Sequence, residues 1–225
     1  TFRQNDIPLP LKLRRVDRYP SLKRPQEPQP PFPYDELEVT YHNELHDVKL
    51  AGTLSLPRSR QPVAAVVLIT GSGSQDRDES IAGHRPFMVI ADALARRGVA
   101  VLRVDDRGMG GSTRGESPAT TLDLAEDVLA GVRFLSERVE IDARRIGLAG
   151  HSEGGLIAPL VAARTDEVAF IVMLAGPGLP GSQILEQQAR LIGEAAKRPE
   201  WFLDWNHKVQ LEMFQIIGDH EDPVE

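Results

Sequence analysis

The residues best suited to chemistry lie at positions 150–154, where the sequence Gly-His-Ser-Glu-Gly places a serine between two glycines. They follow an apolar run at 145–149, so the pattern predicts a buried strand that turns sharply into a helix. A serine at such a turn has a strained backbone, and Gly150 and Gly154 let the strand and helix approach each other. We therefore expect Ser152 to be a nucleophile, with the backbone N–H of Glu153 directed at a developing oxyanion.

A second glycine-rich segment, Thr-Gly-Ser-Gly-Ser-Gln-Asp-Arg-Asp at 70–78, follows an apolar run at 63–69. Ligands bind at the carboxyl ends of parallel strands, which is where this loop would lie. We favour the interpretation that the N–H of Ser72, with Gly73 as the next candidate, is the second oxyanion donor. The alternatives are an ordinary turn and a phosphate loop, and the Lys-Ser or Lys-Thr pair of a phosphate loop is missing.

A serine nucleophile needs a base, and none of the six histidines is well placed to provide one. His151 directly precedes the serine, so the turn directs its side chain away from the serine Oγ, and we expect it to be packed. His84 precedes the serine, and His207 lies in a helical pattern. His220 follows the serine on a loop without a preceding strand, which makes it a poor candidate. The histidines also lack metal-ligand spacing, so we expect no metal and no cofactor.

Residues 105–112, Asp-Asp-Arg-Gly-Met-Gly-Gly-Ser, follow another apolar run at 99–104. The acid of a serine triad follows the nucleophile in this type of sheet, whereas these aspartates precede it. We therefore expect a structural role, in which an Asp–Arg pair fixes the loop through a bidentate contact.

The elements that must position these loops follow from the hydrophobic pattern. Alternating residues at 36–42 and 48–56 predict an antiparallel hairpin. Parallel strands covered on both faces are expected at 63–69, 99–104, 145–149 and 168–175, with helices at 86–97, 122–138 and 153–164. This alternation predicts an α/β fold with a mostly parallel, doubly wound sheet and right-handed crossovers. Two more helical patterns, at 182–197 and 199–217, predict a cap over the sheet.

Composition divides the chain into four predicted parts and limits its partners. They are the tail of an upstream segment at 1–19, a proline-rich linker at 20–35, the α/β core at 36–178, and the cap region at 179–225. A formal net charge of −7 argues against a nucleic-acid partner. The absence of cysteine excludes disulfides and thiol catalysis but leaves the compartment open. No apolar stretch is long enough for a membrane span.

Several motifs together resemble one known family. They are residues 68–78, the Asp-Asp-Arg-Gly-x-Gly-x-Ser segment at 105–112, Gly-His-Ser-Glu-Gly-Gly at 150–155, and Leu-Ala-Gly-Pro-Gly at 174–178. Over about residues 36 to 190 the chain resembles bacterial α/β-hydrolases of the serine aminopeptidase (S33) type, esterases related to prolyl oligopeptidase and dienelactone hydrolase. The resemblance implies an α/β-hydrolase fold and a cofactor-free carboxylic ester hydrolase, with an acyl-enzyme on Ser152 and a small ester or peptide substrate. It also implies oxyanion donors from Glu153 and the Gly71 loop, a helical cap that shapes the acyl pocket, and export to the periplasm or cell exterior.

The sequence departs from this family after the strand expected at 168–175, because the strands whose loops carry the triad Asp and His are missing. We expect a fragment of a longer enzyme, inactive or weak alone, since this strand would otherwise have an unpaired apolar edge. That edge would pair with the missing C-terminal segment or with a second copy of the chain. The alternatives are a serine peptidase or aminopeptidase, a thioesterase, a non-catalytic binding module of the same fold, and, least favoured, nucleotide binding at the Gly71 loop.

Overall fold

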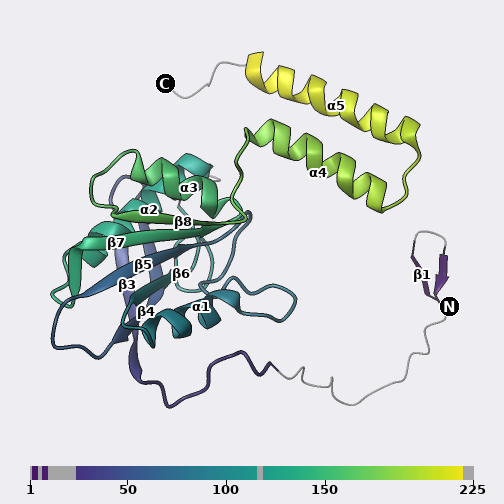
Figure 1. The fold of residues 1–225 in the computed structure, drawn as a ribbon. Helices are drawn as coiled ribbons and strands as arrows, with labels where there is room; N and C mark the ends of the chain where they lie inside the picture. The colour runs from purple at the N-terminus through teal and green to yellow at the C-terminus, as the bar shows by residue number, and fades with distance from the viewer. Residues whose placement is uncertain (1, 5–6, 10–23, 116–118, 220–225) are drawn as a thin grey trace.

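A six-stranded sheet forms the centre of the molecule in the computed structural model, which describes residues 2–4, 7–9, 24–115 and 119–219 (Figure 1). The strand order is β3-β4-β6-β5-β7-β8. The strands are β3 (Tyr34–Asn43), β4 (Val48–Pro57), β5 (Val63–Ile69), β6 (Ala100–Val104), β7 (Ile141–His151) and β8 (Phe170–Leu174). Strand β4 pairs antiparallel with β3 and β6, whereas β6, β5, β7 and β8 are parallel to one another. The predicted hairpin and parallel sheet are therefore confirmed, although β7 begins earlier than the apolar run at 145–149 indicated.

Helices cover both faces of this sheet, as predicted for a doubly wound arrangement. The helices are α1 (Pro86–Ala95), α2 (Thr121–Ser136), α3 (Gly154–Ala162), α4 (Gly181–Ala195) and α5 (Glu200–Asp219). On one face, Phe87 of α1 belongs to a core with Val66 and Leu68 of β5. On the other face, α2 and α3 cover a larger core that contains Val67 and Ile69. Successive residues of β5 thus enter opposite cores, which explains why the strand is apolar throughout.

The start of helix α2 is fixed by local sequence and connects the fold to the site. The side chain of Thr120 accepts a hydrogen bond from the N–H of Asp123, and the Asp123 carboxylate accepts one from the N–H of Thr120. This capping box satisfies two of the amide groups that a helix leaves free at its first turn. The next residue, Thr121, donates its hydroxyl to the carboxylate of Glu153 at 2.7 Å. The N-terminal end of α2 is therefore held by this hydrogen bond to Glu153, the residue that follows Ser152.

The N-terminal part contains a small sheet of its own. Strands β1 (Phe2–Gln4) and β2 (Ile7–Leu9) pair antiparallel, and residues 10–23 lie outside the described part. That residues 1–19 are the tail of an upstream segment stays a prediction. The part of the predicted proline-rich linker that the structure describes contacts the loop before α1. Its Arg24 donates to the carbonyls of Ala82 and Gly83, and Glu27 pairs with Arg85 at 2.7 Å.

The C-terminal helices form a hairpin that projects beyond β8 rather than covering the sheet (Figure 1). Helices α4 and α5 pack on each other where Leu203 lies against Gly193. Their exposed apolar side chains include Leu191, Ile192, Trp201, Trp205, Ile216 and Ile217. The two helices predicted after β8 are present, whereas their role as a cap stays a prediction, because an amphipathic pattern identifies an apolar face without identifying what covers it.

The outer edge of the sheet is apolar, as predicted. Strand β8 is the last strand of the sheet, and its residues Phe170, Ile171, Val172 and Met173 are between 37% and 44% exposed. Within the described residues, no helix combines the length and apolar character that crossing a membrane requires.

Candidate active site

Ser152 occupies the turn between β7 and α3, where the sequence predicted it. Its φ of 52° lies in the left-handed region, which residues other than glycine seldom adopt. The N–H of Ser152 donates to the carbonyl of Leu174 on β8 at 2.9 Å, and the N–H of Gly155 donates to the Ser152 carbonyl at 2.9 Å. Hydrogen bonds to β8 and α3 therefore hold a strained backbone, which is a common property of functional residues.

Close packing around this turn requires glycine at several positions. A Cβ atom on Gly150 would collide with the carbonyl of Gly154, and one on Gly154 would collide with the carbonyl of Ile69 on β5. The obstructing atoms belong to the backbone, so they cannot move aside as a flexible side chain would. Gly155 is constrained as well, because its Cβ would lie 2.6 Å from the Cα of Gly176. Sequence analysis did not identify this last contact, which joins α3 to the segment after β8.

The glycine-rich loop after β5 lies directly against the serine turn. A Cβ atom on Gly71 would be 3.2 Å from the Cβ of Ser152 and 3.4 Å from Nδ1 of His151. The N–H of Gly71 is already occupied, because it donates to Oε1 of Glu79 at 2.8 Å. Gly71 itself is therefore excluded as an oxyanion donor unless this bond breaks.

Unlike the N–H of Gly71, the backbone N–H groups of the three expected oxyanion donors are unpaired in the part of the chain that the structure describes. Among the described residues, none accepts a hydrogen bond from the backbone N–H of Ser72, Gly73 or Glu153. Gly73 has a φ of 89°, a conformation that a side chain would strain. Unpaired amides on two segments that meet at a serine are the arrangement that an oxyanion hole needs.

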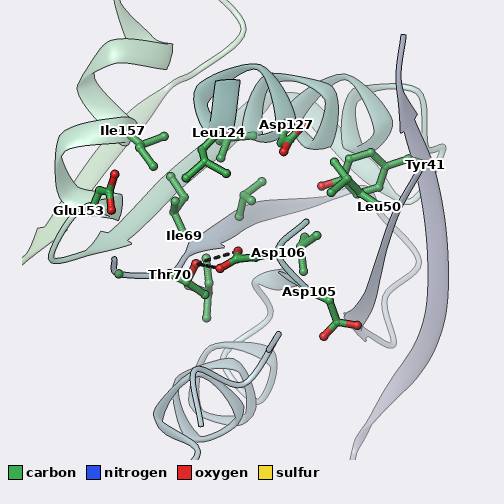
Figure 2. A pocket seen from close by; sticks show the side chains of 15 residues that line it. Tyr41, Leu50, Ile69, Thr70, Asp105, Asp106, Leu124, Asp127, Glu153 and Ile157 are labelled. Atoms are coloured by element: carbon green, nitrogen blue, oxygen red, sulfur yellow. Dashed lines mark hydrogen bonds between the residues drawn. The ribbon is translucent and has the colours of Figure 1, made fainter. Parts of the chain in front are cut away.

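Asp106 holds the two ends of the glycine-rich loop together. Its carboxylate accepts the hydroxyl of Thr70 at 2.9 Å and the N–H of Gln75 at 2.8 Å. Burial raises the pKa of Asp106 to about 6, and the hydrogen bonds from Gln75 and Thr70 reduce this rise without cancelling it. Figure 2 shows the Thr70–Asp106 bond beside a cavity that is also lined by Asp127 and Glu153.

Two hollows adjoin the site, and their sizes distinguish them. The cavity of Figure 2 has a volume of about 40 Å³ and lies between the sheet and helices α2 and α3. A groove of about 680 Å³ has both Gly73 and Glu153 on its wall, together with Arg107, Met109 and Arg114. Small-molecule sites commonly occupy roughly 300–1,000 Å³, so the groove rather than the cavity has room for a substrate.

The expected Asp–Arg contact within residues 105–107 is not formed, although these residues are structural. The carboxylate of Asp105 instead binds the guanidinium of Arg77, with Nη2 at 2.8 Å and Nε at 3.2 Å. Burial alone would raise the pKa of Asp105, but the hydrogen bonds from Arg77 and from the N–H of Gly111 together outweigh it and hold the pKa below its usual value. Arg107 binds Asp127 on α2 at 2.6 Å. These partners are distant in sequence, so the motif could not reveal them.

None of the described histidines forms a hydrogen bond with Ser152. His151 is not packed as expected: its side chain is 44% exposed, and its Nδ1 lies 2.7 Å from Oε1 of Glu79. His84 contacts Arg24, and His207 lines a groove between α4 and α5. His220 lies outside the described residues. In the described part of the chain there is also no cluster of three or more side chains suited to binding a metal ion.

Comparison with known proteins gives consistent matches. Residues 61–212 match the family described as serine aminopeptidase, S33. Esterase EstD of Thermotoga maritima is 30% identical over 162 residues, which cover 72% of this chain and 37% of EstD. The structure of the Pyrococcus furiosus esterase Pf2001 matches with a TM-score of 0.57 and 25% identity, over 79% of this chain and 60% of Pf2001. A hypothetical protein, PA2218 from Pseudomonas aeruginosa, gives a TM-score of 0.57 at 21% identity, over 84% of this chain and 61% of PA2218.

The chain thus spans little more than a third of EstD and about 60% of the two solved structures. The parallel sheet, its helical layers and these structural matches confirm the predicted α/β-hydrolase fold. The family match covers residues 61–212, a stretch that includes the serine turn and both neighbouring loops. The chain therefore belongs to the serine aminopeptidase, S33, family, an esterase-like group of α/β-hydrolases.

Proposed function

We propose that this chain carries the nucleophile and the oxyanion hole of a serine esterase. The observation that carries the proposal is the strained turn at Ser152, against which Gly71 lies, together with the unpaired N–H groups of Glu153, Ser72 and Gly73 beside it in sequence. A fold maintains such strain only where the surrounding contacts impose it. Two relatives, EstD and Pf2001, are named esterases, which supports an ester as substrate over an amide or a thioester.

The reaction would be acyl transfer through a covalent intermediate. Ser152 Oγ attacks the ester carbonyl while a histidine takes its proton, and the N–H of Glu153 and the N–H of Ser72 or Gly73 hold the oxyanion. The alcohol leaves with a proton from that histidine, and water then attacks the acyl-enzyme and releases the acid. This sequence of steps uses no cofactor. Because no described histidine contacts Ser152, we assign the base and its acid partner to polypeptide other than the described residues.

Hydrolysis of a p-nitrophenyl ester by the intact protein that contains this sequence tests the proposal. The Ser152→Ala variant is expected to lower kcat on the order of a millionfold, to the detection limit. Ser59→Ala is the matched control, because Ser59 is an exposed serine in the loop between β4 and β5 whose one hydrogen-bonding partner within the described part of the chain is Gln61. Activity of Ser152→Ala within tenfold of the parent would mean a different nucleophile.

Parallel assays separate the related activities. The same acyl group is offered as an ester, a thioester and an anilide, and we expect the ester to have the highest kcat/KM. A preference for an aminoacyl anilide would instead identify a peptidase. If the intact protein hydrolyses none of them and does not react with a phosphonate, the chain is a binding module that has kept the fold.

A further inference from the structure

Glu79 is a buried acidic residue beside the serine turn to which neither the sequence analysis nor the proposed reaction gives a role. It lies in the loop between β5 and α1, is 5% exposed, and has a φ of 52°. A buried carboxylate is unfavourable unless its hydrogen-bonding capacity is satisfied. The contacts of its carboxylate must therefore offset both the burial and the strained backbone of Glu79.

Among the residues that the structure describes, the Glu79 side chain has two hydrogen-bonding contacts, and both involve one oxygen, Oε1. This atom accepts the N–H of Gly71 at 2.8 Å and lies 2.7 Å from Nδ1 of His151. Because a carboxylate only accepts hydrogen bonds, the second contact places a proton on Nδ1 of His151. Gly71 directly precedes the expected donor Ser72, and His151 directly precedes Ser152. A single atom therefore connects the oxyanion loop to the serine turn.

The loop that carries Glu79 is itself held in place. The N–H of Glu79 donates to the carbonyl of Asp76 at 2.9 Å, and the Asp76 carboxylate accepts the N–H groups of Asp78 at 3.0 Å and Ser80 at 2.9 Å. On its far side, the loop is bound by Arg24 of the N-terminal segment. These hydrogen bonds hold the backbone of Glu79 in place. The position of its carboxylate therefore does not depend on Gly71 and His151 alone.

We propose that Glu79 is a positioning residue that fixes the distance between the oxyanion donors and the nucleophile by binding Gly71 and His151 at once. The inference rests on the proposed function, because the two segments joined are those expected to supply the donors and Ser152. Misplacement of a catalytic group by about 1 Å can lower a rate about a hundredfold. A carboxylate that controls this distance should therefore affect turnover more than substrate binding.

The Glu79→Gln variant of the intact protein tests this role. A glutamine oxygen in the place of Oε1 can still accept from both Gly71 and His151, but it carries no charge, so both hydrogen bonds lose the extra strength that a carboxylate gives them. We expect kcat to fall roughly 10- to 100-fold with KM within about twofold. Glu140→Gln is the matched control, because Glu140 accepts a hydrogen bond from Arg138 at 2.8 Å just before β7 begins, at the opposite end of that strand from the serine turn. This control should lower the thermal stability and leave kcat unchanged.

A second pair of variants separates positioning from simple stabilisation. His151→Asn keeps a donor near the position of Nδ1, whereas His151→Phe removes it. We expect Asn to retain kcat within about threefold and Phe to lose about tenfold. Combining His151→Phe with Glu79→Gln should lower kcat less than the product of the two single effects, since the two residues act as one unit. Independent, multiplying effects would overturn the proposal, as would an unchanged kcat in Glu79→Gln.

Amide hydrogen exchange does not depend on catalysis, so it distinguishes failure of this inference from failure of the proposed function. In Glu79→Gln, the backbone amide of Gly71 should exchange with deuterium at least about tenfold faster, while amides in β5 stay protected. If this exchange does not change, the Glu79 contact does not hold the loop, and the inference is wrong whatever Ser152 does. If Gly71 exchanges faster in Glu79→Gln but Ser152→Ala keeps its activity, Glu79 does hold the two segments together. The proposal that this contact serves catalysis is then refuted.

Discussion

Replacing Asp106 with asparagine should remove a pH-dependent destabilisation of the folded protein while leaving the glycine-rich loop closed. The oxygen of asparagine can accept the N–H of Gln75, and its amide group can donate to the hydroxyl of Thr70. Both contacts at the ends of the loop are therefore retained in altered form. What is lost is the ionisable carboxyl group in a buried position.

The size and sign of the effect follow from the pKa of this group. Burial raises the pKa of Asp106 from 3.8 to about 6. The folded protein therefore retains a proton that the unfolded chain has lost between about pH 4 and pH 6, so the free energy of unfolding falls as the pH rises through this window. Each pKa unit corresponds to about 1.4 kcal/mol, which gives a loss of up to about 3 kcal/mol that is complete above about pH 6.

Urea unfolding at a series of pH values between 4 and 7.5 measures this loss. The difference in unfolding free energy between Asp106→Asn and the parent should grow in favour of the variant by up to about 3 kcal/mol from pH 4 to pH 6.5, and then stay constant. Asp166→Asn, which changes an exposed carboxylate, is the control and should show no such trend. Parallel curves for Asp106→Asn and the parent across this range would refute the reasoning.

Three further changes test other parts of the structure. Gly154→Ala puts a methyl group against the carbonyl of Ile69, so we expect a loss of about 2 kcal/mol or more in unfolding free energy and at least a hundredfold loss of ester hydrolysis; near-normal activity would contradict the packing. Arg24→Ala should raise amide exchange at residues 81–85 about tenfold without affecting the central strands, and equal protection would show that this contact does not brace the loop. The 225-residue chain alone should self-associate through β8, and Val172→Lys should weaken this in sedimentation experiments, whereas a parent chain that stays monomeric at high concentration would contradict it.

The features that sequence analysis predicted depend on neighbouring residues. The serine turn follows from glycines two positions on either side of Ser152, and the strands follow from apolar runs whose period reports the faces that they bury. The order of antiparallel and parallel strands then follows from the hairpin and from the alternation of strands with helices. For the same reason, residues 150–154 by themselves predict the chemistry expected there.

The features that it missed depend on residues that are distant in sequence. Glu79 contacts His151, which lies 72 positions later, and nothing near Glu79 indicates this partner. Asp105 pairs with Arg77 instead of with its neighbour Arg107, because the fold brings the loop after β5 against the loop after β6. The placement of the α4–α5 hairpin is similarly decided by what its apolar faces contact, and a hydrophobic pattern carries no information about that partner.

The most direct test of the central claim is the site of covalent modification by a phosphonate that reacts with activated serines. The intact protein is treated with the probe, digested, and analysed by mass spectrometry. We predict a single adduct on Ser152, which disappears in Ser152→Ala and persists in Ser59→Ala. An adduct on another residue, or the absence of any adduct in protein that hydrolyses esters, would contradict the assignment of Ser152 as the nucleophile.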